Sequence, residues 1–171
     1  MSYGILLLRV VVGVAFVGHG TQKLFGWFGG YGPKGTGGFF GSKGYRAPVL
    51  MAVAAGLSEA GGGTLLALGF ATPLAGALLA TVMINAIAAV TFKRAFMLGS
   101  ELELIYLTIG VSLAATGPGR FSIDRAIGWD DNISGVWWGV GAFGAALIVS
   151  FLTLTLGRTR SVAQQEPAAQ T

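Results

Sequence analysis

The sequence predicts an all-α protein, a polytopic bundle of membrane-spanning helices, and three observations support this prediction. Hydrophobic residues make up 53% of the 171 residues and charged residues only 11%, whereas soluble domains carry about 25% charged residues. The mean hydropathy of +0.71 points the same way. A chain this short cannot bury so many apolar side chains in its own interior. The third observation is that the apolar residues gather into five long stretches.

Each stretch is near the ~20 residues that cross ~30 Å of hydrocarbon as a helix. The stretches cover residues 4–25, 47–71, 73–92, 101–117 and 136–156, and the fourth is the shortest. Helices are expected because backbone groups in lipid must form their hydrogen bonds within their own segment. The alternating pattern of membrane β-strands does not occur. Arg9 interrupts the first stretch and no basic residue precedes it, unlike a cleaved signal peptide, so we expect this helix to be retained.

The connections between the stretches predict how the helices are arranged. Residues 70–74 contain Pro73 and form a tight turn, so the second and third helices are expected to be antiparallel neighbours. Residues 26–46 form a longer, Gly-rich loop with aromatic and basic residues, a composition that suits the membrane–water interface. Most Lys and Arg residues lie on the side of this loop, which predicts an outside N-terminus and a cytoplasmic C-terminus. Residues 158–171 are expected to be a disordered cytoplasmic tail.

Several classes of function are excluded by the composition. With no Cys, the chain offers no disulfide, thiol exchange, Fe–S cluster or thiolate metal site. One His and no Cys give no zinc set, so no metal site is predicted. A net charge of +4 spread over loops does not predict nucleic-acid binding. Residues 30–35 and 139–144 match G-x-G-x-x-G, but neither follows a strand of a βαβ unit, so neither predicts a dinucleotide site.

Seven polar residues at or near membrane depth form the predicted intramembrane site. They are Arg9, His19, Gln22, Lys23, Glu59, Asn85 and Glu101. Ionisable groups in membrane helices are costly and face the bundle interior or water. At 1.5 Å per residue, Arg9 and Glu59 differ in depth by roughly 6 Å, within reach of two long side chains. We therefore expect a polar seam that runs through the bundle from Arg9 to Glu101, with His19 and Asn85 converging below the Arg9–Glu59 pair.

These residues also have plainer structural interpretations. Arg9 and Lys23 are compatible with snorkelling to the near interface. His19 is compatible with a satisfied interior position, and Gln22 shares its face. Asn85 is compatible with a bridge between two helices. Glu101 is compatible with a first-turn acid that the helix dipole favours. Glu59 is the hardest to explain in this way, because a carboxylate at mid-membrane needs a cation or a proton.

Several motifs together resemble the DoxX family of small bacterial integral membrane proteins. The first helix contains LR at residues 8–9 and GHGTQKLF at 18–25, and the following loop contains GGFF at 37–40. The second stretch contains GLSEAGG at 56–62, the fourth begins with GSEL at 99–102, and GPGRFSID at 117–124 follows it. The resemblance covers roughly residues 4–125. The residues that match the family's polar positions are Arg9, His19, Gln22, Lys23, Glu59, Glu101 and Arg120.

The resemblance implies a four-helix membrane core over residues 1–125, in the inner (plasma) membrane of a bacterium. Residues 126–157 would then be a loop and an extra, fifth transmembrane helix, which departs from the family pattern. Some members of the family are linked to thiosulfate–quinone oxidoreduction, and others to membrane complexes that handle oxidative and thiol stress.

Three functions remain open at this point. The first is an accessory subunit of a membrane oxidoreductase or oxidative-stress system, whose intramembrane site binds a quinone-like molecule or stages protons for a redox partner protein. The second is a structural or scaffolding membrane protein whose polar residues lock its helices together. The third is a transporter of protons or small solutes, although no inverted repeat is visible. The sequence does not decide whether the protein is an enzyme, and a quinone is the one cofactor that it suggests.

Overall fold

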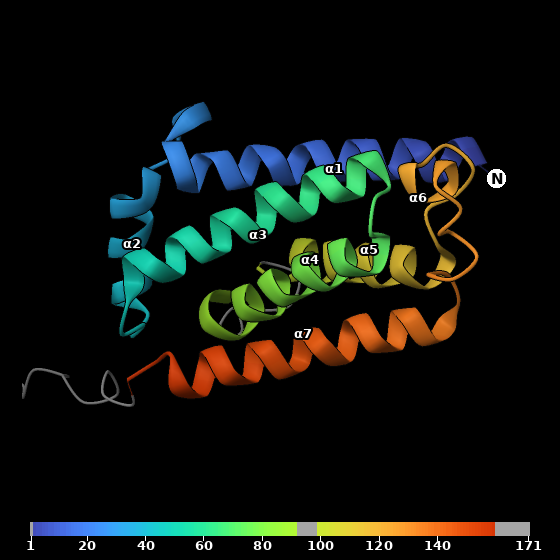
Figure 1. The fold of residues 1–171 in the computed structure, drawn as a ribbon. Coiled ribbons are helices and arrows are strands. Elements are labelled where there is room, and N and C mark those ends of the chain that lie inside the picture. The colour runs from blue at the N-terminus through green and yellow to red at the C-terminus, as the bar shows by residue number, and fades with distance from the viewer. Residues whose placement is uncertain (1, 92–98, 160–171) are drawn as a thin grey trace, which may run out of the picture.

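The computed structural model describes residues 2–91 and 99–159, and within these residues the chain is helical and contains no strand. Five long helices run along a common direction (Figure 1). They are α1 (Ser2–Phe25), α3 (Pro48–Leu68), α4 (Thr72–Ala86), α5 (Glu101–Thr116) and α7 (Val136–Leu156). A π-helical segment, η2 (Ile87–Thr91), continues α4. The prediction of an all-α membrane helix bundle is confirmed.

Four stretches of the described chain are long and apolar enough to cross a membrane. They are Tyr3–Phe25, Pro48–Leu68, Thr72–Ala89 and Val136–Leu156, and they correspond to the first, second, third and fifth predicted helices. The fourth predicted helix is α5, which has 16 residues. That length gives about 24 Å of helix, less than the ~30 Å of a typical hydrocarbon core. The shortest predicted stretch is therefore a helix of less than full spanning length.

The turn between α3 and α4 makes these helices antiparallel neighbours, as the sequence predicts. Gly69 takes a left-handed backbone conformation with φ of 64°. The amide of Phe70 then donates to the carbonyl of Leu65 at 2.9 Å, and that of Gly69 to the carbonyl of Leu66 at 3.1 Å. This pair of backbone hydrogen bonds is a common way to end a helix. It favours Gly at position 69, because Gly carries no Cβ that opposes the left-handed conformation.

Glycines bring the helix backbones into direct contact. A Cβ added to Gly13 of α1 would lie 2.5 Å from the carbonyl oxygen of Gly63 in α3. A Cβ added to Gly76 of α4 would lie 2.5 Å from the carbonyl oxygen of Gly110 in α5. No larger residue fits at such distances, so small residues set how closely these helices pack. The abundance of Gly in this chain is therefore part of its helix packing.

The apolar core lies where α1, α3, α4 and α5 meet. Its largest buried members are Phe16, Leu66, Leu79, Met83 and Leu113. Helix α7 covers α4 and α5 from the other side through a buried row of small residues, Gly139, Ala142, Ala146 and Ser150. Their spacing of three and four residues keeps them on one helical face, while the remaining faces of α7 are exposed and apolar.

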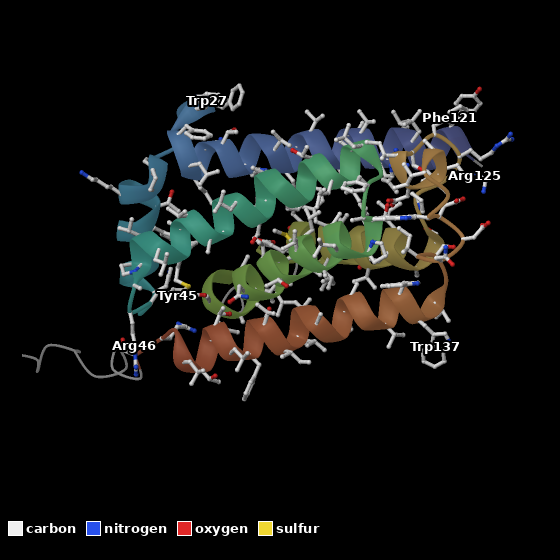
Figure 2. All side chains as sticks on the ribbon, in the orientation of Figure 1. Trp27, Tyr45, Arg46, Phe121, Arg125 and Trp137 are labelled. Carbon is white, nitrogen blue, oxygen red and sulfur yellow. The ribbon has the colours of Figure 1, made fainter. Side chains whose placement is uncertain are left out.

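The short elements lie at the two ends of the bundle. Helix α6 (Ile123–Ala126) lies at the end where α1 begins, whereas η1 (Trp27–Gly29) and α2 (Gly32–Ser42) lie at the opposite end (Figure 1). Aromatic side chains mark both ends, with Trp27 at one and Trp137 at the other (Figure 2). This placement matches the aromatic belts of membrane proteins.

The loop predicted over residues 26–46 contains the helix α2. Pro33 stands in the first turn of α2, where its fixed φ favours helix formation and its missing amide costs nothing. The buried residues Gly32, Thr36 and Gly37 hold α2 against the rest of the protein, and α2 packs mainly on α3. Tertiary contacts thus outweigh the low helix propensity of Gly. Of the predicted tail, Arg158 and Thr159 are described and pair with this region, and residues 160–171 lie outside the described chain.

Candidate functional site

A cavity of about 390 Å³ lies in the half of the bundle that ends at α2. Its wall is mostly apolar, and it is formed by residues of α1, α2, α3, α4, α5 and α7 together with the segment between α2 and α3. The aromatic lining residues are Phe16, Phe39, Phe40, Tyr45 and Tyr106. The polar lining residues are His19, Lys23, Lys43, Ser58, Glu59, Thr81, Asn85, Glu103 and Thr153. Four of the seven residues predicted for the site, His19, Lys23, Glu59 and Asn85, therefore line one cavity.

An ion pair between α1 and α3 lies on the cavity wall. The ammonium of Lys23 donates to Oε2 of Glu59 at 2.5 Å. The side chain of Glu59 is only 4% exposed, whereas that of Lys23 is 23% exposed. Because a buried carboxylate needs a cation or a proton, Lys23 is the group that makes the burial of Glu59 tolerable. Lys23 does not simply snorkel to the interface, which was one interpretation of its position.

His19 and Gln22 form a second polar group on the same helix. Nδ1 of His19 lies 3.1 Å from Oε1 of Gln22. The side-chain nitrogen of Gln22, Nε2, donates to the backbone carbonyl of Phe28 at 3.2 Å. Gln22 therefore connects His19 to η1, where Phe28 has a left-handed backbone with φ of 52°. Only His19 of this pair lines the cavity, and Gln22 orients it from outside.

Asn85 joins α4 to α7 on the opposite wall. Its side-chain nitrogen donates to the carbonyl of Thr81 and to Oγ of Ser150, both at 3.0 Å. Its oxygen accepts from Oγ1 of Thr153 at 2.8 Å and from the hydroxyl of Tyr45 at 3.4 Å. The inter-helix role is one that the sequence left open for Asn85. Nothing in the sequence indicated its partners Ser150 and Thr153, which lie on the helix outside the family pattern.

The structure does not place Glu101 among the residues that line the cavity. The carboxylate of Glu101 accepts from the backbone amide of Gly99 at 3.0 Å, at the start of α5. Glu103 lines the cavity instead. The two acids are two positions apart on a helix and point in different directions. Which of the two acids lines the cavity depends on the rotation of α5 about its axis, and hydropathy does not predict that rotation.

The structure does not bring Arg9 to Glu59, whose partner is Lys23 instead. Arg9 is buried and donates to four backbone carbonyls at the other end of the bundle. Two of these, Leu66 and Ala67, lie in the last turn of α3, and the other two, Pro118 and Phe121, lie in the loop after α5. Arg9 thus ties the last turn of α3 to the loop after α5. The continuous seam from Arg9 to Glu101 is replaced by two separate polar clusters.

Asp124 completes the cluster around Arg9. Its fully buried carboxylate accepts from the amides of Ala71 and Thr72 at 2.8 and 3.1 Å, and from Oγ1 of Thr72 at 2.9 Å. These amides lie at the N-terminus of α4, where a negative charge is favoured by the helix dipole. Within the described chain, the side chains of Arg9 and Asp124 form hydrogen bonds with backbone groups and with one hydroxyl, so this cluster holds helix ends together.

A shallow polar depression lies at the same end. Arg120 and Arg125 line it together with Asp130 and residues 116–119. The guanidinium of Arg125 donates to Asp130 at 2.7 Å, and this hydrogen bond and charge raise the pKa of Arg125. Among the described residues, no three His, Cys, Asp or Glu side chains lie close enough together to hold a metal ion.

Comparisons with known proteins give one family and one relative. The sequence model of the DoxX family matches residues 4–93 of this chain. A Bacillus subtilis (strain 168) protein that carries the name "Putative oxidoreductase CatD" is 38% identical over 121 residues, which are 71% of this chain and 84% of that protein. No solved structure matches the chain. The matched range contains His19, Lys23, Glu59 and Asn85, so the polar lining residues of α1, α3 and α4 fall within it.

Proposed function

Because this chain belongs to the DoxX family of membrane proteins, we propose that it is an accessory membrane subunit of an oxidoreductase or oxidative-stress system. Its cavity is the proposed site of a small aromatic molecule of the quinone class. The Lys23–Glu59 ion pair on a mostly apolar cavity wall is the observation that carries the proposal. The relative named as an oxidoreductase supports it.

The composition of the cavity wall suits such a ligand. Ligand sites are concave, largely apolar and equipped with a few placed polar groups, with volumes of ~300–1,000 Å³. The cavity of about 390 Å³ falls in this range. The rings of Phe16 and Tyr106 lie edge to face with centroids 5.1 Å apart, and both line the cavity. Aromatic rings of this kind pack against a flat ring of a ligand.

The polar groups have complementary roles in this proposal. Quinone oxygens accept hydrogen bonds, and Lys23 and His19 are the donors that the first helix offers to the cavity. Glu59 holds Lys23 in place and is a group that can exchange a proton within the bundle. Because the chain has no Cys, the electrons for a redox step are proposed to come from a membrane or peripheral redox protein that associates with it.

The distribution of charge supports an orientation. Lys34, Lys43, Arg46 and Arg158 lie at or beside α2, whereas Arg120 and Arg125 lie at the end where α1 begins. The positive-inside rule therefore favours α2 and the end of α7 on the cytoplasmic side of the bacterial plasma membrane. In this orientation the cavity lies in the cytoplasmic half of the bundle.

A scaffold is the alternative that the second cluster favours. Arg9 and Asp124 form their hydrogen bonds with backbone groups at helix ends and in the adjoining loop, which is a structural role. The transporter hypothesis requires a path across the bundle, and the lining of the cavity does not extend to Arg9 or Asp124. The polar groups that line the cavity favour ligand binding over both alternatives.

Purification in mild detergent, followed by extraction and mass spectrometry of bound quinones, tests the proposal. We expect quinone to copurify with the protein and to be lost from Glu59→Gln, which keeps the shape of the side chain but removes its charge. Glu101→Gln is the matched control, because Glu101 lies outside the cavity lining. Wild-type protein without quinone, or equal retention by both variants, would reject a quinone site at Glu59 and favour the scaffold.

A further inference from the structure

A short segment that follows α7 holds the chain between α2 and α3. We call residues 157–159 the latch and residues 43–46 the linker. The amide of Arg46 donates to the carbonyl of Gly157 at 2.9 Å, and the amide of Thr159 donates to the carbonyl of Gly44 at 2.8 Å. Tyr45 and Arg158 face each other as an antiparallel bridge. The latch and the linker thus form a minimal antiparallel pair.

Arg158 adds side-chain contacts to this pair. Its Nε and one terminal nitrogen both donate to the carbonyl of Lys43, at 3.0 and 2.8 Å. Its guanidinium carbon lies 5.6 Å from the centre of the Tyr45 ring, within the range of a cation–π contact. Arg158 therefore contacts the linker twice, at the backbone carbonyl of Lys43 and at the aromatic ring of Tyr45.

The linker in turn covers the cavity at the end of the bundle that carries α2. Lys43 and Tyr45 line the cavity, and the hydroxyl of Tyr45 contacts Asn85 on the far wall. Tyr45 and Arg46 lie at this end of the bundle, beside the end of α7 (Figure 2). The latch therefore holds the linker in place at the end of the cavity that lies beside α2.

The lateral boundary of the cavity is more open. In the described residues, α1 and α5 form no close backbone interface, and the rings of Phe16 and Tyr106 bridge them. His19 on α1 and Leu102 on α5 both line the cavity, yet both are also exposed on the surface. These two exposed residues therefore mark the side of the bundle between α1 and α5 as an edge of the cavity.

We propose that the latch closes the aqueous end of the cavity, so that the cavity takes molecules dissolved in the membrane and excludes charged, water-soluble ones. The substrate class is thereby narrowed to apolar ligands that reach the site between α1 and α5. The proposal concerns the cavity of the proposed function and rests on it for the identity of the ligand. The latch lies beyond the matched family range. In this proposal it decides whether the cavity is reached from water or from the membrane.

Labelling of a single introduced thiol tests this access directly. The chain has no Cys, so Ser58→Cys places the only thiol on the cavity wall. The protein in lipid nanodiscs, which leave both faces open to solvent, is treated with pyrene maleimide, which partitions into the bilayer, or with a quaternary-ammonium methanethiosulfonate, which stays in water. The same labelling is repeated with Ser58→Cys/Arg158→Ala. The control is Ser58→Cys/Arg46→Ala, because Arg46 has an exposed side chain in the linker and the same charge.

We expect pyrene maleimide to label all three proteins at similar rates. The cationic reagent should label Ser58→Cys and its Arg46→Ala control slowly, and Ser58→Cys/Arg158→Ala about tenfold faster, because two hydrogen bonds from a charged donor to the linker are lost. Rapid cationic labelling without the Arg158 change, or equal slow labelling with it, would overturn the proposal, as would failure of pyrene maleimide to reach the thiol. A melting temperature for each variant shows that its fold persists, and Ser58→Cys/Arg158→Lys should give an intermediate rate. Labelling requires no quinone, so its outcome is independent of the test at Glu59.

Discussion

The ammonium of Lys23 lies 2.5 Å from the carboxylate of Glu59, although 36 positions separate these residues in the sequence. Their ion pair joins α1 to α3 beside the cavity. Because Glu59 is almost fully buried and the Lys23 side chain is only 23% exposed, we expect each residue to depend on the other for a tolerable environment.

A double-mutant cycle measures this dependence. Lys23→Met and Glu59→Gln should each lower the free energy of unfolding by about 3 kcal/mol, since each leaves a charge without its partner inside the bundle. The double variant should cost less than the sum, with a coupling of roughly 1–3 kcal/mol. Reversible unfolding in mixed micelles gives the values. Lys34→Met, at an exposed position of α2, is the control for loss of a lysine. Strictly additive effects of Lys23→Met and Glu59→Gln would argue against the coupling.

Arg9 should be more sensitive to a conservative change than an exposed arginine is. Arg9→Lys keeps the charge but loses the guanidinium fork that reaches four carbonyls. Each buried carbonyl left without a donor costs ~1–3 kcal/mol, so we expect a loss of about 3 kcal/mol or more in the free energy of unfolding. Arg120→Lys, at an exposed position of the same end, should change stability by less than about 0.5 kcal/mol. Equal effects of the two variants would contradict the role assigned to Arg9.

Two glycines of α3 provide a matched pair for the packing of α1 on α3. A Cβ at Gly63 would lie 2.6 Å from the carbonyl oxygen of Gly13 and 2.9 Å from Cβ of Phe16, whereas a Cβ at Gly61 would meet nothing within 4 Å. Gly63→Ala should therefore cost about 1–3 kcal/mol, the range seen for overpacked interiors. Gly61→Ala should be neutral or slightly stabilising, because Ala favours helix more than Gly does. Thermal unfolding of the two variants side by side checks the order.

Stability should fall at alkaline pH through Tyr45. Burial raises the pKa of the Tyr45 phenol above its usual value, and the nearby charge of Arg158 offsets this only in part. A raised pKa in the folded state means that Tyr45 contributes stability below the ordinary tyrosine pKa of about 10 and that this contribution is lost as the pH rises through the higher folded value. The difference in unfolding free energy between wild type and Tyr45→Phe should therefore be constant near neutral pH and shrink above about pH 10. Tyr31→Phe, which removes an exposed phenol, is the control, and a pH-independent difference for Tyr45→Phe would refute the assignment.

The sequence predicted the helices well because hydropathy reports directly on them. The positions of all five long helices follow from apolar stretches of near-spanning length, and the antiparallel α3–α4 pair follows from the tight turn at Pro73. His19, Lys23, Glu59 and Asn85 were selected because polar groups at membrane depth rarely face lipid, and all four line one cavity.

The partners of these residues could not be predicted because the register between helices is set by contacts that hydropathy does not report. The predicted 6 Å difference in depth between Arg9 and Glu59 assumes that the loop-side ends of the first two helices are level with each other. In the structure Gly13 packs on Gly63, and Gly20 packs beside Ala60. With this register the first turn of α3 extends beyond the last residue of α1. Glu59 then meets Lys23, and Arg9 lies beside Leu66.

Rotation about the helix axis was the second unknown. A helix turns by about 100° per residue, so Glu101 and Glu103 point about 200° apart, and the rotation of α5 about its axis decides which of them lines the cavity. Tyr45 and Thr153 were missed because one lies in a loop and the other is a hydroxyl that a helix interior can satisfy by itself. Only the three-dimensional pairing of the linker and α7 identifies them.

Helix α1 begins at the end of the bundle that carries α6, and α7 ends at the opposite end beside α2 (Figure 1). A reporter enzyme fused ahead of α1 and a fluorescent protein fused behind α7 would thus sample two different compartments. Ending the chain after α5 would transfer the downstream reporter to the compartment of the upstream one. A single deletion of α7 should consequently invert the fluorescence readout, and the measurement requires no ligand.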